Sequence, residues 1–211
     1  MKKRIICFGD SLTWGADPAG GPRLEDRWPL VLQAELGDGY TVIEEGQGGR
    51  TIGTDDPVEG EKNGARYITP CLESHSPFDL LIVMLGTNSC KRKFNYSMLD
   101  ISWEMTQFLQ KVYAHRHWQA EDGYQVLLIA PPPLNDGLRH AELGEMFGYD
   151  EGKARSEQLA AVYRPLAERF GCHFMDAAEH AKSSPVDGVH LDAENEIRLG
   201  KAVARRVREI L

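Results

Sequence analysis

The chain has 211 residues, 42% of them hydrophobic and 27% charged, and this ordinary composition excludes a wholly disordered or fibrous protein. Its length predicts a single domain, residues 1–211, with enough chain to bury a sizeable core. The formal net charge of −8 argues against a nucleic-acid partner, because a protein that binds the phosphate backbone needs a basic face.

Cysteine usage and the N-terminus limit the remaining classes. The cysteines, Cys7, Cys71, Cys90 and Cys172, form no CxxC pair, so their spacing argues against a zinc site and we expect no metal. The apolar stretch after the basic N-terminus spans only residues 5–8, which is too short for a signal peptide or a membrane span. We therefore predict a cytoplasmic, reduced protein that does not enter a membrane.

Short apolar runs alternate with helical patterns along the chain. We expect strands at residues 3–9, 41–44, 79–85, 126–130 and 172–175. We expect helices at residues 29–36, 64–75, 98–115 and 151–170, and a last helix that begins at Asp192. Strands that alternate with helices form a parallel α/β sheet. The predicted fold is a three-layer α/β/α sandwich with a flavodoxin-like five-stranded parallel sheet of order 2-1-3-4-5.

Residues 131–149 are predicted to form a long loop, and long loops in compact domains are often functional. This loop contains Leu138, Leu143, Met146 and Phe147. We expect these apolar side chains to line a pocket or to meet a partner subunit, since they would otherwise leave an exposed apolar patch. The stretch therefore favours a homo-oligomer.

Polar or glycine-rich segments follow four of the predicted strands. Ser11 follows the first strand, Gly49 the second and Asn88 the third, while Asp187 and His190 come after the fifth, before the last helix. Parallel strands place these segments at one edge of the sheet. In open α/β sheets that edge is where ligands bind.

The residue types at this edge match what ester cleavage requires. Ser11 is the candidate nucleophile, and His190 is the candidate base because imidazole accepts a proton near neutral pH. Asp187 is placed to hold the other ring nitrogen of His190. The backbone N–H groups of Ser11 and Gly49 and the side-chain amide of Asn88 are candidate donors to the oxyanion.

Taken singly, these segments have plainer interpretations. Gly9-Asp10-Ser11 is also an ordinary turn or helix cap, Asn88 a turn residue and Asp187 a loop carboxylate. Their common position after strands, in this order, favours the catalytic interpretation.

Four sequence blocks resemble those of the SGNH (GDSL) hydrolases, in that family's order and over almost the whole chain. The blocks are Gly9-Asp10-Ser11-Leu12, Gly49, Gly86-Thr87-Asn88 and Asp187-Gly188-Val189-His190. The resemblance implies a Ser11 nucleophile, a triad completed by Asp187 and His190, and oxyanion donors at Gly49 and Asn88. It implies the same flavodoxin-like fold.

Longer matches, at residues 8–15, 42–46, 55–57 and 84–88, resemble the bacterial arylesterase/acyltransferase group. Members of that group hydrolyse short-chain esters, transfer acyl groups to alcohols or peroxide, and form compact oligomers. Asp10 and Trp14, close to Ser11, are accordingly expected at the substrate site. Ser89 stands where the family usually has aspartate, which puts the local support of Asn88 in question.

The sequence thus predicts a serine esterase that acts on a small-molecule ester with no cofactor, and that also transfers acyl groups to alcohols. A carbohydrate O-deacetylase of the same family is an alternative. A flavodoxin-like module that binds phosphate or flavin is disfavoured, because the chain has no P-loop and no clean GxGxxG motif.

Overall fold

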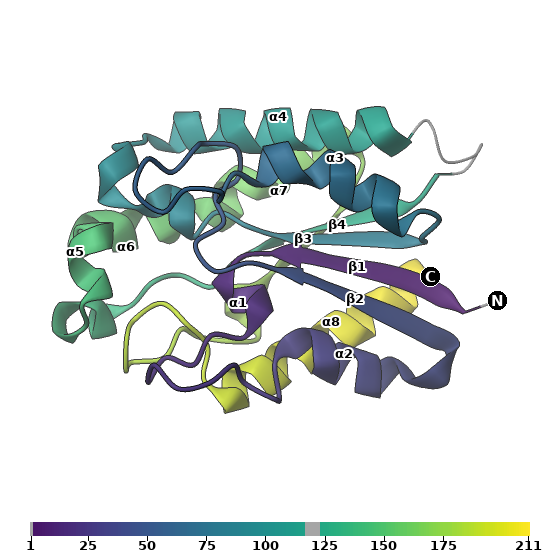
Figure 1. Cartoon of the computed structure of the whole chain (residues 1–211), viewed down its shortest axis with the longest axis horizontal. Helices are drawn as coiled ribbons and strands as arrows, with labels where there is room; N and C mark the ends of the chain where they lie inside the picture. The colour runs from purple at the N-terminus through teal and green to yellow at the C-terminus, as the bar shows by residue number, and fades with distance from the viewer. Residues whose placement is uncertain (1, 117–122) are drawn as a thin grey trace.

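The computed structural model describes residues 2–116 and 123–211. Five strands form one sheet: β1 (Lys3–Gly9), β2 (Tyr40–Gly46), β3 (Leu80–Met84), β4 (Gln125–Ala130) and β5 (His173–Asp176). The order is β2-β1-β3-β4-β5 and every neighbouring pair is parallel, so the predicted sheet is confirmed. Figure 1 shows the strands running side by side, away from the two termini.

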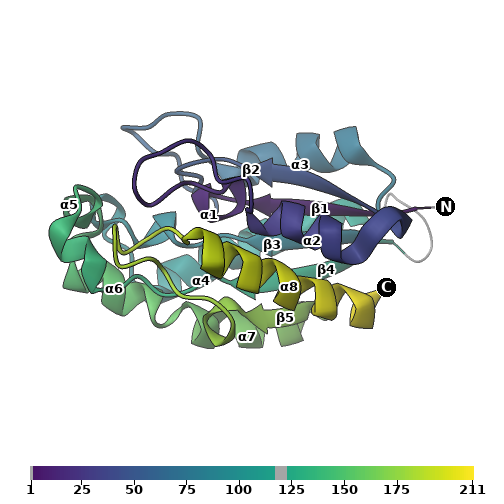
Figure 2. The same ribbon diagram turned by 90° about the horizontal axis from the view of Figure 1, so that it is seen from below.

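Helices cover both faces of the sheet (Figures 1 and 2). One layer contains α3 (Gly64–His75), α4 (Met98–Arg116) and α7 (Leu159–Phe170), and the other contains α2 (Trp28–Leu36) and α8 (Ala193–Ile210). Ile6 and Phe8 face the first layer, whereas Ile5 and Cys7 face the second. A strand buried on both faces explains the continuous apolar run. No helix of the described part of the chain is long and apolar enough to cross a membrane.

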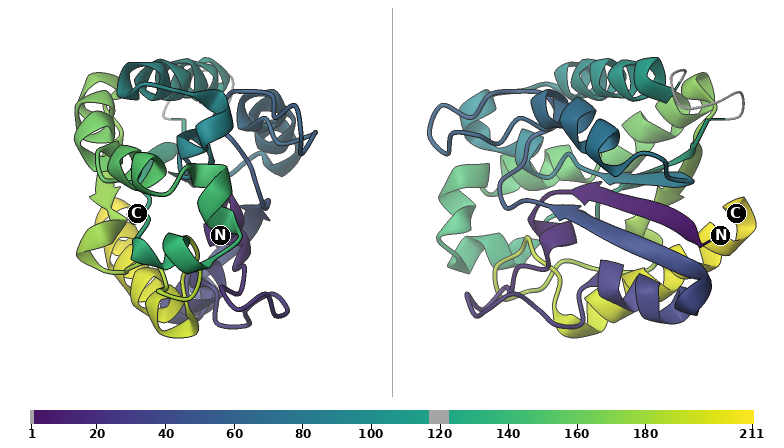
Figure 3. Two further views of the ribbon diagram at one scale, coloured as in Figure 1. Left: turned by 90° about the vertical axis from the view of Figure 1, so that its left-hand side faces the viewer. Right: turned by 45° about the vertical axis from the view of Figure 1, so that its right-hand side comes forward.

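The register brings the ends of the central strands to one level. Gly9 is paired with Gly46 on β2 and with Met84 on β3. The short helix α1 (Ser11–Trp14) and two further short helices, α5 (Leu143–Phe147) and α6 (Asp150–Ser156), lie at this end of the molecule. Figure 3 (left) shows that end facing the viewer.

Residues 131–149 are not the long loop that the sequence predicts. They contain a 3₁₀ helix, Asp136–His140, and helix α5. These turns direct Leu138 and Phe147 into the core, while Met146 remains 37% exposed. Leu138 and Phe147 are therefore core residues, and the prediction that they line a pocket or meet a partner subunit is wrong for these two.

The single helix predicted at residues 151–170 is divided into α6 and α7. The Ser156 hydroxyl donates to the Lys153 carbonyl (2.7 Å) and accepts from the Leu134 N–H (2.9 Å). A serine that bonds in this way competes with the backbone bonds of a helix. The division therefore falls before α7, and Pro165 lies within α7.

Candidate active site

Ser11 stands on a tight turn between β1 and α1. Asp10 caps α1, with its Oδ1 accepting from the Leu12 N–H at 3.0 Å. A Cβ atom at Gly9 would lie 2.0 Å from the Thr13 hydroxyl oxygen and 2.8 Å from the Met84 carbonyl oxygen, so only glycine fits there. The turn thus holds Ser11 at the carboxyl end of a central strand, with 8% of the residue exposed.

His190 connects Ser11 to Asp187. Its Nε2 lies 2.9 Å from the Ser11 Oγ and its Nδ1 lies 2.6 Å from Asp187 Oδ2. The other oxygen of Asp187 accepts the backbone N–H groups of Val189 (2.9 Å) and His190 (3.0 Å). These bonds fix both the loop and the orientation of the ring.

The charge on Asp187 determines which nitrogen of His190 carries the proton. Burial acts to raise the pKa of Asp187, but the bonds from His190 and the Val189 N–H outweigh it and leave that pKa below its ordinary value. An ionised carboxylate accepts from Nδ1–H, so Nε2 is left to accept from the Ser11 hydroxyl. The three side chains predicted from separate segments therefore form one hydrogen-bonded line.

Asn88 begins a short 3₁₀ helix, Asn88–Cys90, after β3. Its side-chain Nδ2 donates to Asp10 Oδ2 at 3.3 Å and to the Arg50 carbonyl at 3.1 Å. Burial raises the pKa of Asp10 to about 6, while the Leu12 N–H and the charges of His190, Arg50 and Lys91 oppose that rise. Asp10 is fully buried and faces Asn88 and the α1 backbone.

Gly49 lies in a segment held in place by ion pairs. Its φ of +78° favours glycine, and a Cβ there would lie 2.3 Å from Glu59 Oε2. Glu59 pairs with Lys91 and, at 3.2 Å, with Lys93. Lys91 follows the Asn88 turn and its side chain is 3% exposed. The pairs therefore tie the Gly49 segment to the Asn88 segment.

Ser89 has a partner that the sequence did not indicate. Its hydroxyl donates to Glu104 Oε2 on α4 at 2.9 Å. The other Glu104 oxygen accepts from the Thr54 hydroxyl and from the Gly53 N–H at 3.3 Å. Burial raises the pKa of Glu104 despite these bonds. Because a carboxylate already occupies this position, serine at position 89 supports the Asn88 turn where an aspartate would meet a second negative charge.

Trp14 ends α1 and is 37% exposed. The Arg23 guanidinium lies over its ring, 5.3 Å from the centroid, and also bonds Glu44 Oε2 at 2.7 Å. The indole therefore carries a cation on one face, at the surface next to the Ser11 turn.

A polar cleft of about 640 Å³ lies beside the Gly49 segment. Glu45, Gln47, Arg50, Arg66 and Tyr67 are among its lining residues. Neither Ser11 nor His190 lines it, although the carbonyl of Arg50 accepts from Asn88. The cleft is thus a neighbour of the Ser–His–Asp line and is separate from it.

The family of the chain follows from comparison with known proteins. The model of the GDSL-like lipase/acylhydrolase family matches residues 7–202. The chain therefore belongs to this family, and it is a carboxylic ester hydrolase with the SGNH fold.

Two solved structures are similar over the full length of the chain. A carbohydrate acetylesterase from Sinorhizobium meliloti, Est24, is 38% identical, with 100% of each chain covered and a TM-score of 0.88. The aryl esterase of M. smegmatis is also 38% identical, with 99% of this chain and 100% of that chain covered and a TM-score of 0.88. A search of curated proteins finds no match.

Proposed function

We propose that the protein cleaves short-chain carboxylic esters through an acyl-Ser11 intermediate. The observation that carries the proposal is the continuous line from Ser11 Oγ to His190 Nε2 (2.9 Å) and from His190 Nδ1 to Asp187 Oδ2 (2.6 Å). This arrangement has the three roles of a serine-hydrolase triad: nucleophile, base and orienting carboxylate.

The reaction runs in two halves. Ser11 Oγ attacks the ester carbonyl carbon while His190 takes its proton, and the carbonyl oxygen becomes an oxyanion. The C–O bond to the leaving alcohol then breaks as His190 returns the proton to that alcohol, which leaves an acyl-serine. Water, deprotonated by His190, attacks the acyl carbon, and the acid is released with Ser11 reprotonated. The anionic Asp187 stabilises the imidazolium in both halves.

The oxyanion is assigned to the N–H groups of Ser11 and Gly49 and to the Asn88 amide. Asn88 Nδ2 has two hydrogens, and in the free protein they point to Asp10 and to the Arg50 carbonyl. The bond to Asp10, at 3.3 Å, is the longer of the two and is the one we expect an oxyanion to share. This makes Asp10 a residue that positions Asn88, rather than one that contacts substrate.

The acyl-enzyme is testable directly. A fluorophosphonate reagent should label Ser11 stoichiometrically, and brief mixing with p-nitrophenyl acetate should add one acetyl group to the peptide that contains Ser11. Mass spectrometry of the digested protein reads both results. Labelling at another serine would contradict the assignment.

A carbohydrate acetylesterase is the second candidate. The polar cleft next to Arg50 supports it, since charged and hydroxyl-binding side chains suit a sugar, and one similar structure is named a carbohydrate acetylesterase. A panel of p-nitrophenyl esters of increasing acyl length, run beside acetylated monosaccharides, separates the two. A kcat/KM that is higher for the acetylated sugars would select the second candidate.

Acyl transfer to alcohols is part of the proposal. Trp14, which lies on α1 with Ser11, supplies an apolar surface that favours an alcohol over water. With a vinyl ester and benzyl alcohol in buffer, we expect benzyl ester to accumulate alongside the free acid. Acid alone, formed at a rate independent of the alcohol, would restrict the enzyme to hydrolysis.

Self-association remains a prediction, and fewer exposed apolar side chains support it than the sequence suggested. Leu138 and Phe147 lie in the core, so within residues 131–149 the exposed Met146 and Tyr149 are available to meet a second copy, and the exposed Val58 lies near Met146. Light scattering at micromolar concentration should give a mass above that of one chain. A monomer would count against an oligomer.

A further inference from the structure

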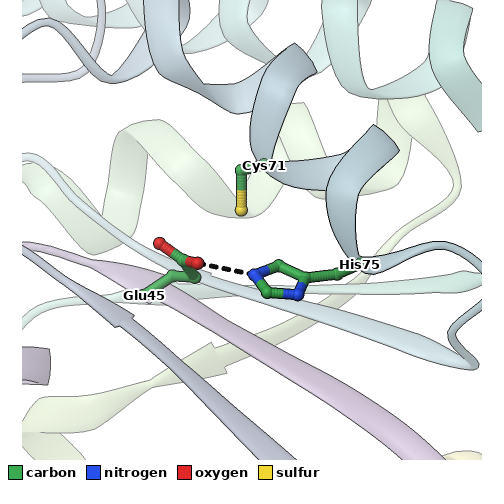
Figure 4. Close-up of side chains that lie close together, drawn as sticks. All are labelled: Glu45, Cys71 and His75. Carbon is green, nitrogen blue, oxygen red and sulfur yellow. Dashed lines mark hydrogen bonds and ion pairs between the residues drawn. The ribbon is translucent and has the colours of Figure 1, made fainter.

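A second group of polar side chains lies between the edge strand β2 and helix α3. Glu45 is near the carboxyl end of β2, and Cys71 and His75 are on the last turns of α3. Figure 4 shows the Cys71 sulfur and the His75 ring facing the Glu45 carboxylate. The proposed ester chemistry uses none of the three.

Their donor atoms converge on one point. His75 Nε2 lies 2.6 Å from Glu45 Oε1, and one donor atom from each of the three side chains lies within 4.8 Å of the others. Spacing of four residues puts Cys71 and His75 on the same face of α3. In residues 2–116 and 123–211, no other set of three or more Cys, His, Asp and Glu side chains forms such a group.

We propose that Glu45, Cys71 and His75 bind a zinc ion. Thiolate sulfur, imidazole nitrogen and carboxylate oxygen are the ligands that Zn²⁺ takes in proteins, at about 2.0–2.3 Å, which places tetrahedral donors about 3–4 Å apart. The observed separations need only small side-chain movements to reach that geometry. The ion takes the place of the hydrogen between Glu45 and His75.

Burial and access suit a bound ion. Cys71 is buried, whereas the side chains of Glu45 and His75 are 16% and 26% exposed, so the ion reaches the site from their side. Glu45 also lines the polar cleft, which leaves a fourth position for water. Zinc binding would release the proton of the Cys71 thiol to solvent, and the resulting thiolate together with the Glu45 carboxylate would balance the charge of Zn²⁺.

Arg50 is a positively charged residue close to the proposed zinc site. Its guanidinium donates to the backbone carbonyls of Glu45 and Gly9, and it lies 4.3 Å from the centroid of Phe8. Its Nε also donates to Gln47 Oε1 at 3.3 Å, and the guanidinium makes no hydrogen bond to the Glu45 carboxylate, although its charge acts on Glu45 and Cys71. Zinc would join the edge strand β2 to α3 and stabilise the fold, without a step in ester cleavage.

The cysteine spacing led us to expect no metal, and the proposed site departs from that expectation because spacing bears only on sites of the CxxC kind. Here one ligand comes from a strand and two from a helix one turn apart. Only folding brings them together, so the cysteine spacing carries no signal of the site.

Cobalt(II) chloride is the probe for the test, because a thiolate bound to Co²⁺ gives a charge-transfer band in the near ultraviolet. Full-length protein treated with chelator should bind one Co²⁺ with that band, and Zn²⁺ should displace it. Cys71→Ser should lose the band, and His75→Gln should weaken Co²⁺ binding at least tenfold. Cys172→Ser, which removes a half-buried thiol elsewhere, is the matched control and should keep the band. Saturating Zn²⁺ should raise the Tm of the wild type by about 5 °C.

A wild type without the band, or a Cys71→Ser variant that keeps it, would overturn the proposal. If Cys71→Ser does not fold, as judged by circular dichroism, Glu45→Gln and His75→Gln decide the question. Unchanged Co²⁺ affinity in both of those variants would overturn it. Esterase activity is recorded separately, so failure of the zinc site leaves the Ser11 assignment untouched.

Discussion

Two histidines in this protein are each held by a carboxylate at the same distance, yet their surroundings differ. Asp187 lies 2.6 Å from Nδ1 of His190, and Glu45 lies 2.6 Å from Nε2 of His75. In the first pair the carboxylate takes Nδ1, so Nε2 is free to reach Ser11. In the second the carboxylate takes Nε2 itself. The open nitrogen of His190 meets the Ser11 hydroxyl, so this histidine has a neighbour from which it can take a proton.

The third member of each group differs as well. Ser11 is 8% exposed, on the turn at the sheet edge, whereas Cys71 is 1% exposed in the core. Burial, with the charge of Glu45, raises the pKa of Cys71 to about 12. In the metal-free protein a thiol with such a pKa is neutral at physiological pH and is not a nucleophile; only displacement of its proton by a metal ion would make it a thiolate. A histidine beside a carboxylate thus belongs to a catalytic triad at Ser11, whereas at Cys71 it belongs to a group of potential metal ligands.

Removing the nucleophile should produce the largest effect. Ser11→Ala is expected to lower kcat for p-nitrophenyl acetate by at least about 10⁴-fold, because the reactive hydroxyl is lost while its partners stay in place. Circular dichroism should show an unchanged fold. Ser102→Ala, a half-buried serine on α4, is the control and should keep full activity. Comparable activity in the two variants would mean that Ser11 is not the nucleophile and that the contrast between the two histidine sites is wrong.

Loss of one oxyanion donor should rank next. Asn88→Ala is expected to lower kcat by about 10²–10³-fold, with a much smaller change in KM, since the amide acts in the transition state. Ser89→Ala removes only a bond to Glu104 from the same turn and should have a clearly smaller effect. Equal losses would mean that the turn as a whole, and not the Asn88 amide, is what matters.

Asp10→Asn tests the positioning role. In Asp10→Asn the new NH2 group would point either toward the Asn88 NH2 or toward the Leu12 N–H, and two donors would face each other in both cases. One good bond is therefore lost, and kcat should fall about tenfold. A kcat equal to that of the wild type would remove Asp10 from the site.

The same variant has a signature in stability against pH. The pKa of Asp10 is raised from 3.8 to about 6 in the folded protein, so the folded state holds the proton longer than the unfolded chain. The stability of the wild type relative to Asp10→Asn should therefore fall as the pH rises from about 4 to 6, by of the order of 1 kcal/mol per pH unit. Urea titrations at several pH values measure this difference. A constant difference would contradict the raised pKa.

The smallest effect is expected at His75. In metal-free buffer, His75→Gln should lower the free energy of unfolding by no more than about 1 kcal/mol, because the Glu45–His75 pair is partly exposed. His190→Gln should instead abolish turnover at nearly unchanged stability. Chemical denaturation and p-nitrophenyl acetate assays of both variants sharpen the contrast between the two histidines.

Much of the fold, and the grouping of Ser11, His190 and Asp187, was predictable because both depend on local sequence patterns. Apolar runs such as Leu80–Met84 indicate strands buried on both faces, and their alternation with helices implies a parallel sheet. Parallel strands end at one edge, so Ser11, Asn88 and His190 were expected together before any distance was known. This expectation needs only that each of the three residues follows its own strand in the chain.

Tertiary structure alone decided what depends on contacts between distant side chains. Leu138 and Phe147 point into the core because short helices, which no periodic pattern indicates, turn the chain there. Glu104 lies on α4 and accepts from the Ser89 hydroxyl, which follows β3. The approach of Glu45 to His75 is of the same kind, since these residues belong to different elements and neither has a motif. The sequence by itself therefore determined the sheet and the residues at its edge, because hydrophobic periodicity and the order of elements can be read from neighbouring residues. The partners of those residues were decided by packing, which brings together side chains far apart in the chain.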